Sequence, residues 1–324
     1  MGGKVVLCRP NGFCAGVDRA IKIVDLALDA YGAPIYVNHE IVHNQYVVET
    51  LAAKGAVFVD DLDQVPVGER LIYSAHGVPP NLREQAKARQ LRELDATCPL
   101  VTKVHMEALR FARKGYHIFL IGHANHIEVI GTYGEVPDAI TIVEPHRGQA
   151  LEDHLNSLPK PPTDQLIYLT QTTLNVDDCL GVVAALQKRF PTLSPPPSDD
   201  ICYATTNRQN AVKAMAPKMD YFLVVGSPTS SNSKRLVEVA EEEGCSATLV
   251  QGGQSTAKLD LSHAGTIGLT AGASTPDVLI REVIDHLAER GFDLLEFFDH
   301  ITEDLHFNLP HELRTDLETR GISV

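Results

Sequence analysis

Several features that would place a chain in a broad class are missing from this sequence. It has no tryptophan and only 6% aromatic residues, which argues against an aromatic platform for stacking nucleic-acid bases. No apolar run approaches the roughly 20 residues that a membrane-spanning helix needs, and the N-terminus lacks the apolar core of a signal peptide. We therefore expect a cytoplasmic protein that binds neither nucleic acid nor membrane, and the formal net charge of −14 opposes both partners as well.

Motifs for nucleotide binding and for simple electron carriers are also missing. No G-x-G-x-x-G follows the first expected strand, and no G-x-x-x-x-G-K-[ST] occurs in the chain, so chemistry that depends on a bound nucleotide is unsupported. The cysteines include no closely spaced triplet of the ferredoxin type. This disfavours a protein that only carries electrons.

What the sequence does contain is a regular alternation of short β-rich runs and helical segments. At 324 residues, with 44% hydrophobic and 22% charged residues, the chain is long enough for two or three domains of roughly 100–150 residues. The expected strands cover residues 4–8, 34–37, 56–59, 70–74, 117–121, 139–143, 166–169, 221–225, 247–250 and 266–269. The expected helices cover residues 15–31, 43–51, 81–91, 99–114, 176–190, 204–215, 233–243 and 276–290. This order predicts α/β domains with parallel sheets, in which ligands collect at the carboxyl ends of the strands.

Two proline-rich stretches interrupt the alternation. Residues 191–198 read Pro-Thr-Leu-Ser-Pro-Pro-Pro-Ser, and residues 158–164 read Leu-Pro-Lys-Pro-Pro-Thr-Asp. The first is typical of a domain linker, and the second of a surface loop before a strand.

Three of the six cysteines share one sequence context. Cys14, Cys98 and Cys202 each stand where a loop is expected to enter a helix, roughly one domain apart, and each is followed five or six residues later by a basic residue. These basic residues are Arg19, Lys103 and Arg208. The simplest interpretation is three related α/β units, each offering one cysteine at a helix N-terminus, where the charged thiolate is favoured.

Three thiolates suit one kind of metal centre better than another. Structural zinc takes four closed ligands, whereas a cubane 4Fe–4S cluster can be held by three cysteines with one iron left open. Most single intracellular cysteines are instead small buried hydrophobes, and we accept that interpretation for Cys8, Cys179 and Cys245.

Polar segments follow several of the expected strands. They lie at residues 74–77, 122–126, 170–173, 226–233 and 270–274. Hydroxyl, amide and imidazole groups at helix N-termini can bind an anion without a lysine, so these segments predict a phosphate pocket. Ser231 and Asn232 could alternatively cap the helix that follows them.

Glu128 stands two residues after His126, in a loop before a short expected helix. A carboxyl group beside a cluster and a bound anion could deliver protons. Its spacing alone favours an ordinary exposed glutamate.

Residues 39–43, His-Glu-Ile-Val-His, match the H-E-x-x-H pattern of zinc proteases. That site needs both histidines on one helical face. Here a strand is expected to end at residue 37 and a helix to begin near His43, so the histidines would straddle a loop. We therefore disfavour a zinc hydrolase, and His43 could instead face an anion.

With these segments in view, the chain resembles the LytB/IspH family of 4-hydroxy-3-methylbut-2-enyl diphosphate reductases from about residue 5 to 285. The resemblance rests on long motifs: N-G-F-C-A-G-V-D-R-A-I at 11–21, H-E-I-V-H-N at 39–44, S-A-H-G-V at 74–78, D-A-T-C-P-L-V-T-K-V-H at 95–105, G-H-A-N-H-I-E-V at 122–129, T-Q-T-T-L at 170–174, D-D-I-C-Y-A-T-T-N-R-Q at 199–209, S-S-N-S at 230–233 and T-A-G-A-S-T-P-D at 270–277. Departures from the usual family pattern, at Asn125, Ile127 and Ile130, flank His126 and Glu128.

The resemblance implies a fold and a cofactor. The fold would be a trefoil of three pseudo-threefold-related α/β domains with parallel sheets around a central cluster. The domains would cover residues 14–97, 98–198 and 199–290, the third including the N-terminal strand in 1–13, and residues 291–324 would close over the site. Cys14, Cys98 and Cys202 would hold one 4Fe–4S cluster whose fourth iron is open to substrate.

The resemblance also implies a reaction and its residues. The family reduces the allylic diphosphate to isopentenyl and dimethylallyl diphosphate, the last step of the non-mevalonate isoprenoid pathway, with a flavodoxin or ferredoxin as electron donor. Glu128 would be the proton source, with Thr172 in its hydrogen-bond network and His126 beside it. The residues that would hold substrate are His43, His76, His126, Thr172, Ser230, Ser231, Asn232 and Ser274.

Two further alternatives stay open at this point. Quinolinate synthase is another three-domain protein with one cluster cysteine per domain, although the motifs above fit it poorly. A non-catalytic iron–sulfur redox sensor would use the same cysteines without turning over a diphosphate. No interface signature is visible, so we expect a monomer.

Overall fold

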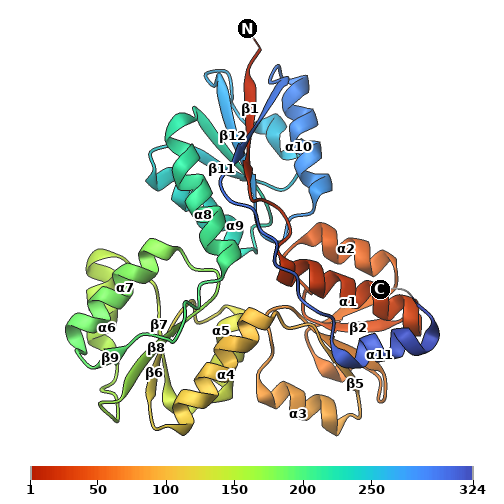
Figure 1. Ribbon diagram of the computed structural model, residues 1–324, viewed down its shortest axis with the longest axis vertical. Helices are drawn as coiled ribbons and strands as arrows, with labels where there is room; N and C mark the ends of the chain where they lie inside the picture. Colours follow the sequence, from red (N-terminus) through yellow and green to blue (C-terminus); the bar gives the residue numbers. More distant parts are fainter. Residues whose placement is uncertain (1, 323–324) are drawn as a thin grey trace. The chain divides into compact units, whose positions relative to one another are not determined.

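The computed structural model describes residues 2–322, and every strand pair within this part of the chain is parallel. The strands form three sheets, traced in Figure 1. Contacts divide the chain into two compact units. The first comprises the N-terminal segment to Val17, His43–Val47 and Tyr203–His306, and the second comprises Asp18–Val42, Val48–Cys202 and the segment from Phe307. The predicted α/β class with parallel sheets is confirmed.

The first unit contains a five-stranded sheet in the order β11-β10-β12-β1-β13. Its strands are β1 (Lys4–Arg9), β10 (Tyr221–Val225), β11 (Ala247–Val250), β12 (Thr266–Ala271) and β13 (Leu294–Asp299). Its helices are α8 (Tyr203–Met215), α9 (Ser231–Glu242) and α10 (Asp277–Glu289), with 3-10 turns at Ala216–Lys218 and Gly253–Lys258.

Strand β1 shows why this sheet is covered on both faces. Successive residues of a strand face opposite sides of a sheet. Val5 and Leu7 pack with residues of α10, whereas Val6 and Cys8 pack with residues of α8 and α9. Figure 1 accordingly shows α10 on one side of the sheet and α8 and α9 on the other. Burial of both faces explains why the strand is a continuous apolar run.

The second unit contains two four-stranded sheets, in the orders β3-β2-β4-β5 and β7-β6-β8-β9. The strands of the former are β2 (Ile35–Asn38), β3 (Ala56–Val59), β4 (Arg70–Tyr73) and β5 (Arg92–Asp95). Those of the latter are β6 (His117–Ile121), β7 (Ile140–Val143), β8 (Leu166–Thr170) and β9 (Leu193–Ser194). The remaining helices of the described chain are α1 (Ala15–Tyr31), α2 (Gln45–Ala53), α3 (Pro80–Ala88), α4 (Pro99–Arg113), α5 (Ile127–Glu135), α6 (Gly148–Ser157), α7 (Val176–Arg189) and α11 (His311–Arg320), with 3-10 turns at Leu62–Gln64 and Pro137–Ala139.

The sheet around β6 repeats the two-faced packing. Phe119 and Ile121 pack with residues of α6 and α7, whereas Ile118 and Leu120 pack with residues of α4. All four side chains are fully buried. The loops that leave the carboxyl ends of β6 and β8 therefore start from a rigid core.

The proline-rich segment 191–198 is not only the linker that its composition predicts. It contributes β9, which pairs with β8 through Leu193 and Ser194. The segment 158–164, by contrast, is the surface loop that was predicted, because it precedes β8 and is largely exposed.

The C-terminal segment is ordered in both units. Residues 294–299 form β13, paired with β1, and α11 buries Leu313 and Leu317 in the second unit. The Tyr31 hydroxyl donates to Asp316 Oδ2 at 2.7 Å, which holds α11 to the end of α1. The predicted domain boundaries, and the predicted closure of residues 291–324 over the site, stay predictions. No helix among the described residues combines the length and apolarity needed to cross a membrane.

Candidate active site

The three cysteines that share a sequence context also share a backbone geometry. Cys14, Cys98 and Cys202 each stand one residue before a helix, namely α1, α4 and α8. Their backbone N–H groups donate to Ala273, Ala75 and Thr172 carbonyls at 3.1, 2.9 and 3.0 Å. Each of these acceptors lies two residues beyond the end of a strand: β12, β4 and β8, respectively.

This repeated bond anchors each cysteine to one of the polar strand-end segments. A single backbone hydrogen bond fixes the point at which the chain enters each helix. The predicted repeat of three related units is therefore visible in the hydrogen bonding as well as in the sequence.

The other three cysteines differ in their burial, which raises the pKa of their thiols. Cys8, Cys179 and Cys245 are buried among apolar side chains. Burial raises the pKa of the Cys8 and Cys179 thiols to about 12 and also raises that of Cys245, so these thiols stay protonated and are poor metal ligands. All six cysteines lie in the described chain, and none forms a disulfide.

Glu128 corrects an expectation from the sequence. It is not in an exposed loop but in the first turn of α5, and its residue is only 2% exposed. His126 caps this helix, because its Nδ1 accepts a hydrogen bond from the Glu128 N–H at 3.2 Å. Local spacing could not reveal this environment, because Thr172, the partner of the carboxyl group, lies 44 residues away.

Thr172 holds the buried carboxylate from two directions. Its backbone N–H donates to Glu128 Oε1 at 2.6 Å, and its hydroxyl donates to Glu128 Oε2 at 3.0 Å. The carbonyl of the same residue accepts the bond from the Cys202 N–H. One residue thus connects the candidate proton donor to a candidate cluster ligand.

Two of the predicted histidines meet within the second unit. The rings of His76 and His126 are 6.2 Å apart between centroids and nearly perpendicular. His76 Nδ1 is 3.3 Å from the Ser74 hydroxyl. The segments 74–77 and 122–126 therefore bring their imidazoles together, although β4 and β6 belong to different sheets rather than to one shared edge.

The predicted anion-binding residues of the first unit cluster at the start of α9. Ser230 is the N-cap, since its hydroxyl oxygen accepts the Ser233 N–H at 3.3 Å. The capping role that the sequence offered Ser231 and Asn232 thus falls to Ser230. All three side chains are almost fully buried, at a helix end whose dipole favours an anion.

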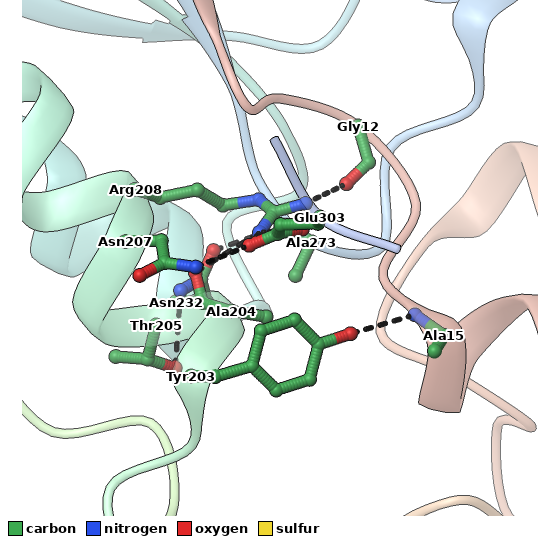
Figure 2. A network of polar contacts seen from close by, with 10 residues as sticks. All are labelled: Gly12, Ala15, Tyr203, Ala204, Thr205, Asn207, Arg208, Asn232, Ala273 and Glu303. Carbon is green, nitrogen blue, oxygen red and sulfur yellow. Dashed lines mark hydrogen bonds and ion pairs between the residues drawn. The ribbon is translucent and has the colours of Figure 1, made fainter. Parts of the chain in front are cut away.

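Asn232 connects this helix end to the cysteine of the same unit. Its Oδ1 accepts the Ala273 N–H at 3.0 Å (Figure 2), and the Ala273 carbonyl accepts the Cys14 N–H. The neighbouring Ser274 hydroxyl donates to the His43 carbonyl at 3.0 Å. His43, Asn232, Ser274 and the Cys14 backbone therefore belong to one hydrogen-bonded assembly.

The His-Glu-Ile-Val-His segment has the loop conformation that the sequence predicted. β2 ends at Asn38 and α2 begins at Gln45, so the two histidines do not share a helical face. His39 has a φ of 62° and its Nδ1 lies 2.6 Å from Asp60 Oδ1. Among the described residues, no three His, Cys, Asp or Glu side chains gather closely enough for a single metal ion; a cubane places its ligands on separate irons.

Comparison with known proteins decides the family. A model of the LytB protein family matches residues 5–288. The chain belongs to the LytB family. It is 52% identical to the 4-hydroxy-3-methylbut-2-enyl diphosphate reductase of Mycolicibacterium vanbaalenii, covering 97% of this chain and 91% of that one. It is 53% identical to that of Rhizobium rhizogenes, covering 95% and 92%.

Solved structures of the family agree with this fold. The E-1-hydroxy-2-methyl-but-2-enyl-4-diphosphate reductase from Plasmodium falciparum matches with a TM-score of 0.92 at 41% identity, covering 99% of this chain and all of that one. A structure described as (E)-4-hydroxy-3-methyl-but-2-enyl diphosphate reductase, the terminal enzyme of the non-mevalonate pathway, matches with a TM-score of 0.61 at 28% identity, covering 89% and 99%. These matches favour neither a quinolinate synthase nor a redox sensor.

Sequence reasoning missed a buried histidine that supports this LytB-family site. His105 of α4 is 3% exposed, and its Nδ1 lies 2.9 Å from Glu135 Oε1. A Cβ atom added to Gly77 or to Gly131 would lie only about 3.2 Å from this ring. Gly77 follows His76 and Gly131 is one turn after Glu128, so His105 packs between both candidate functional segments.

A second missed residue is Tyr203, directly after Cys202. Its hydroxyl oxygen accepts the Ala15 N–H at 3.3 Å (Figure 2). Burial raises its pKa to about 12, so the phenol stays neutral and can occupy the N-terminus of α1. The signal was present in the motif around Cys202, but its partner 188 residues away was not predictable.

The protonation of Glu128 follows from its burial. Desolvation raises the pKa of this carboxyl from 4.5 to about 7, although both Thr172 hydrogen bonds act in the opposite direction. The negative charge of Asp200 raises it further. A carboxyl group that titrates near neutrality is suited to give and take protons.

This pKa makes stability depend on pH in a defined direction. Between about pH 4.5 and 7 the folded state binds more protons at Glu128 than the unfolded state does, so the free energy of unfolding falls as pH rises through that window. Glu128→Gln removes the effect. The melting temperature of the variant minus that of wild type, measured anaerobically, should be higher at pH 8 than at pH 5. A difference between the two proteins that does not change with pH would contradict the raised pKa.

Proposed function

We propose that the chain catalyses the reductive removal of the allylic hydroxyl from 4-hydroxy-3-methylbut-2-enyl diphosphate. The substrate would take up two electrons and two protons and lose water, giving isopentenyl or dimethylallyl diphosphate in the last step of the non-mevalonate isoprenoid pathway. The observation that carries the proposal is Thr172, which donates twice to the buried Glu128 carboxylate and accepts from the Cys202 backbone. Thr172 therefore links the Glu128 carboxyl group to the backbone of Cys202, which supports a proton donor close to a thiolate ligand.

The cofactor in this proposal is a 4Fe–4S cluster held by Cys14, Cys98 and Cys202, with its fourth iron open. The donor set fits because these three cysteines share a loop-to-helix position and an anchoring hydrogen bond, whereas the other three are buried as hydrophobes. When bound, such a cluster supplies electrons and a Lewis-acidic iron.

The protein's own acid–base group in this proposal is Glu128. Because burial raises its pKa to about 7, the Glu128 carboxyl group is protonated in a large fraction of the molecules near neutral pH. It can therefore donate a proton to the hydroxyl group of the substrate as that group leaves as water. Thr172 orients the carboxyl group through two hydrogen bonds. His126, which caps the same helix, would lie beside the reacting end of the substrate.

The diphosphate would be held by imidazole, hydroxyl and amide groups together with a helix N-terminus. The proposed contacts are His43, His76, His126, Thr172, Ser230, Ser231, Asn232 and Ser274. Helix dipoles and backbone amides add to such side chains and offset the net charge of −14. A flavodoxin or ferredoxin in the cytoplasm would donate the electrons. The chain would act as a monomer.

Turnover tests this proposal. The protein is purified anaerobically, and 4-hydroxy-3-methylbut-2-enyl diphosphate is added with a chemically reduced dye as electron donor. We expect isopentenyl and dimethylallyl diphosphate to appear as the dye is oxidised. A protein that contains iron and sulfide yet oxidises no dye with this substrate would contradict the proposal.

Asn232→Asp tests the diphosphate site separately from the chemistry. Aspartate has the same shape and keeps the oxygen that accepts the Ala273 N–H, but it places a negative charge where the phosphates would bind. Like-charge juxtaposition should raise KM about tenfold or more, with a smaller change in kcat. Asn81→Asp, on the exposed surface of α3, is the control, and an Asn232→Asp enzyme with the control's KM would remove this residue from the site.

A further inference from the structure

The basic residues that follow the three cysteines have a shared task in the structure. Arg19, Lys103 and Arg208 lie five or six residues after Cys14, Cys98 and Cys202, in helices α1, α4 and α8. Each donates to a backbone carbonyl in the few residues N-terminal to a different cysteine, and we call that short segment the approach to the cysteine. The pattern is cyclic: the helix after the first cysteine holds the approach to the second, the next holds the approach to the third, and the last holds the approach to the first.

Arg19 holds the approach to Cys98. Its Nη1 donates to the Thr97 carbonyl at 3.0 Å, and its Nε donates to the Asn308 carbonyl at 2.7 Å. Burial lowers the pKa of this guanidinium, and the negative charges of Asp95 and Cys98 oppose that effect. The side chain is therefore bonded to the residue immediately before Cys98 and lies within electrostatic reach of the thiolate.

Lys103 holds the approach to Cys202. Its Nζ donates to the carbonyls of Ser198 and Asp199 at 2.9 and 2.8 Å and to Asp200 Oδ1 at 3.0 Å. Asp200 Oδ2 in turn accepts the Thr170 N–H at 3.0 Å. All the donors of one ammonium group are thus used on the segment that ends at Cys202.

Arg208 holds the approach to Cys14 and is the most buried of the three. Its Nη2 donates to the Gly12 carbonyl at 2.9 Å, and its Nη1 donates to both carboxylate oxygens of Glu303 at 3.1 Å (Figure 2). Asn207 adds a bond to Glu303 Oε1 at 3.0 Å. A buried charged side chain is costly unless it is paired, and this one, which is 1% exposed, is paired with Glu303 and with backbone carbonyls.

We propose that Arg19, Lys103 and Arg208 are positioning residues that each fix the backbone leading into one of the three cysteine ligands, a role that rests on the proposed function. Each cysteine is followed by its own helix, and the backbone before it is held by the basic residue of another cysteine's helix. A cubane tolerates little error in the placement of its ligands, and partners of metal ligands are worth about 10–100-fold in metal affinity or activity.

The test compares three variants with matched exposed controls. Arg19→Gln is compared with Lys22→Gln in the same helix, and Lys103→Gln with Arg113→Gln in the same helix. Arg208→Lys is compared with Arg281→Lys, because lysine keeps the charge that Glu303 needs but cannot also reach Gly12 with a guanidinium fork. For each holoenzyme we measure the rate of iron release to a chelator, the electron paramagnetic resonance spectrum of the reduced protein, and the melting temperature after the cluster is removed.

The positioning role predicts a specific combination of results. Each of the three variants should release iron about 10–100-fold faster than its control and show a changed spectrum, while the cluster-free melting temperatures stay close together. Iron release at the control rate would overturn this inference but not the proposed function. An unchanged spectrum in a variant that only melts at a lower temperature would do the same. A wild-type protein without iron and sulfide would overturn the proposed function and this inference with it.

Discussion

Glu128→Gln is expected to lose most turnover while keeping the cofactor and the substrate site. Glutamine fills the same space and still offers an oxygen to the Thr172 N–H, which now donates to Glu128 Oε1. It has no proton to deliver, and a general acid contributes roughly 10²–10⁴-fold to a rate. Steady-state turnover with a reduced dye measures the loss, which should appear in kcat with little change in KM.

The control for this prediction is Glu152→Gln, an exposed position in α6. It removes the same charge from the surface and should leave turnover unchanged. Iron and sulfide content should match wild type in both variants. Near-normal turnover of Glu128→Gln would refute the proton-donor role, whatever the burial of the group.

Cys98→Ala is expected to have the largest effect of all, with iron, acid-labile sulfide and turnover all falling to background. A cubane with three protein ligands has no substitute donor when one is removed, and alanine cannot ligate. Cys14→Ala and Cys202→Ala should behave alike, because all three cysteines occupy the same structural position. Metal and sulfide analysis of anaerobically purified protein measures this directly.

The buried cysteines provide the matched comparison. Cys179→Ala and Cys245→Ala remove thiols that burial keeps protonated, so both variants should retain cluster and turnover and lose only a little stability. If Cys98→Ala kept a full complement of iron and sulfide, or if Cys179→Ala lost it, the assignment of ligands would be wrong.

Much of the fold could be predicted from the sequence because the central strands are buried on both faces. β10 and the part of β6 after His117 are uninterrupted apolar runs, and a run of that kind between turn residues has few alternatives. The edge strands β3, β7 and β11 were still predicted, but the edge strands β5 and β13 were not. β5 reads Arg-Glu-Leu-Asp, and Leu294 and Phe297 of the edge strand β13 are about half exposed, so neither shows the burial that makes a strand recognisable.

Only those features of the candidate site that depend on neighbouring residues in the sequence could be predicted. The positions of three cysteines before three helices follow from the sequence around each. The burial of Glu128 does not, because it depends on Thr172, 44 residues away. Likewise the spacing of Arg19, Lys103 and Arg208 was visible, but the carbonyls before the cysteines to which they donate lie 78 to 196 residues away. Backbone carbonyls leave no trace in the identity of a residue, so these contacts could not be predicted.

The central claim is that three thiolates hold one cubane whose open iron meets the substrate, and Mössbauer spectroscopy tests it most directly. Protein labelled with ⁵⁷Fe is purified anaerobically, and spectra are recorded with and without 4-hydroxy-3-methylbut-2-enyl diphosphate. The account predicts about four irons and four sulfides per chain, with the signal of one iron changed by the diphosphate. Zinc in place of iron and sulfide, or a cluster whose irons all ignore the diphosphate, would contradict it.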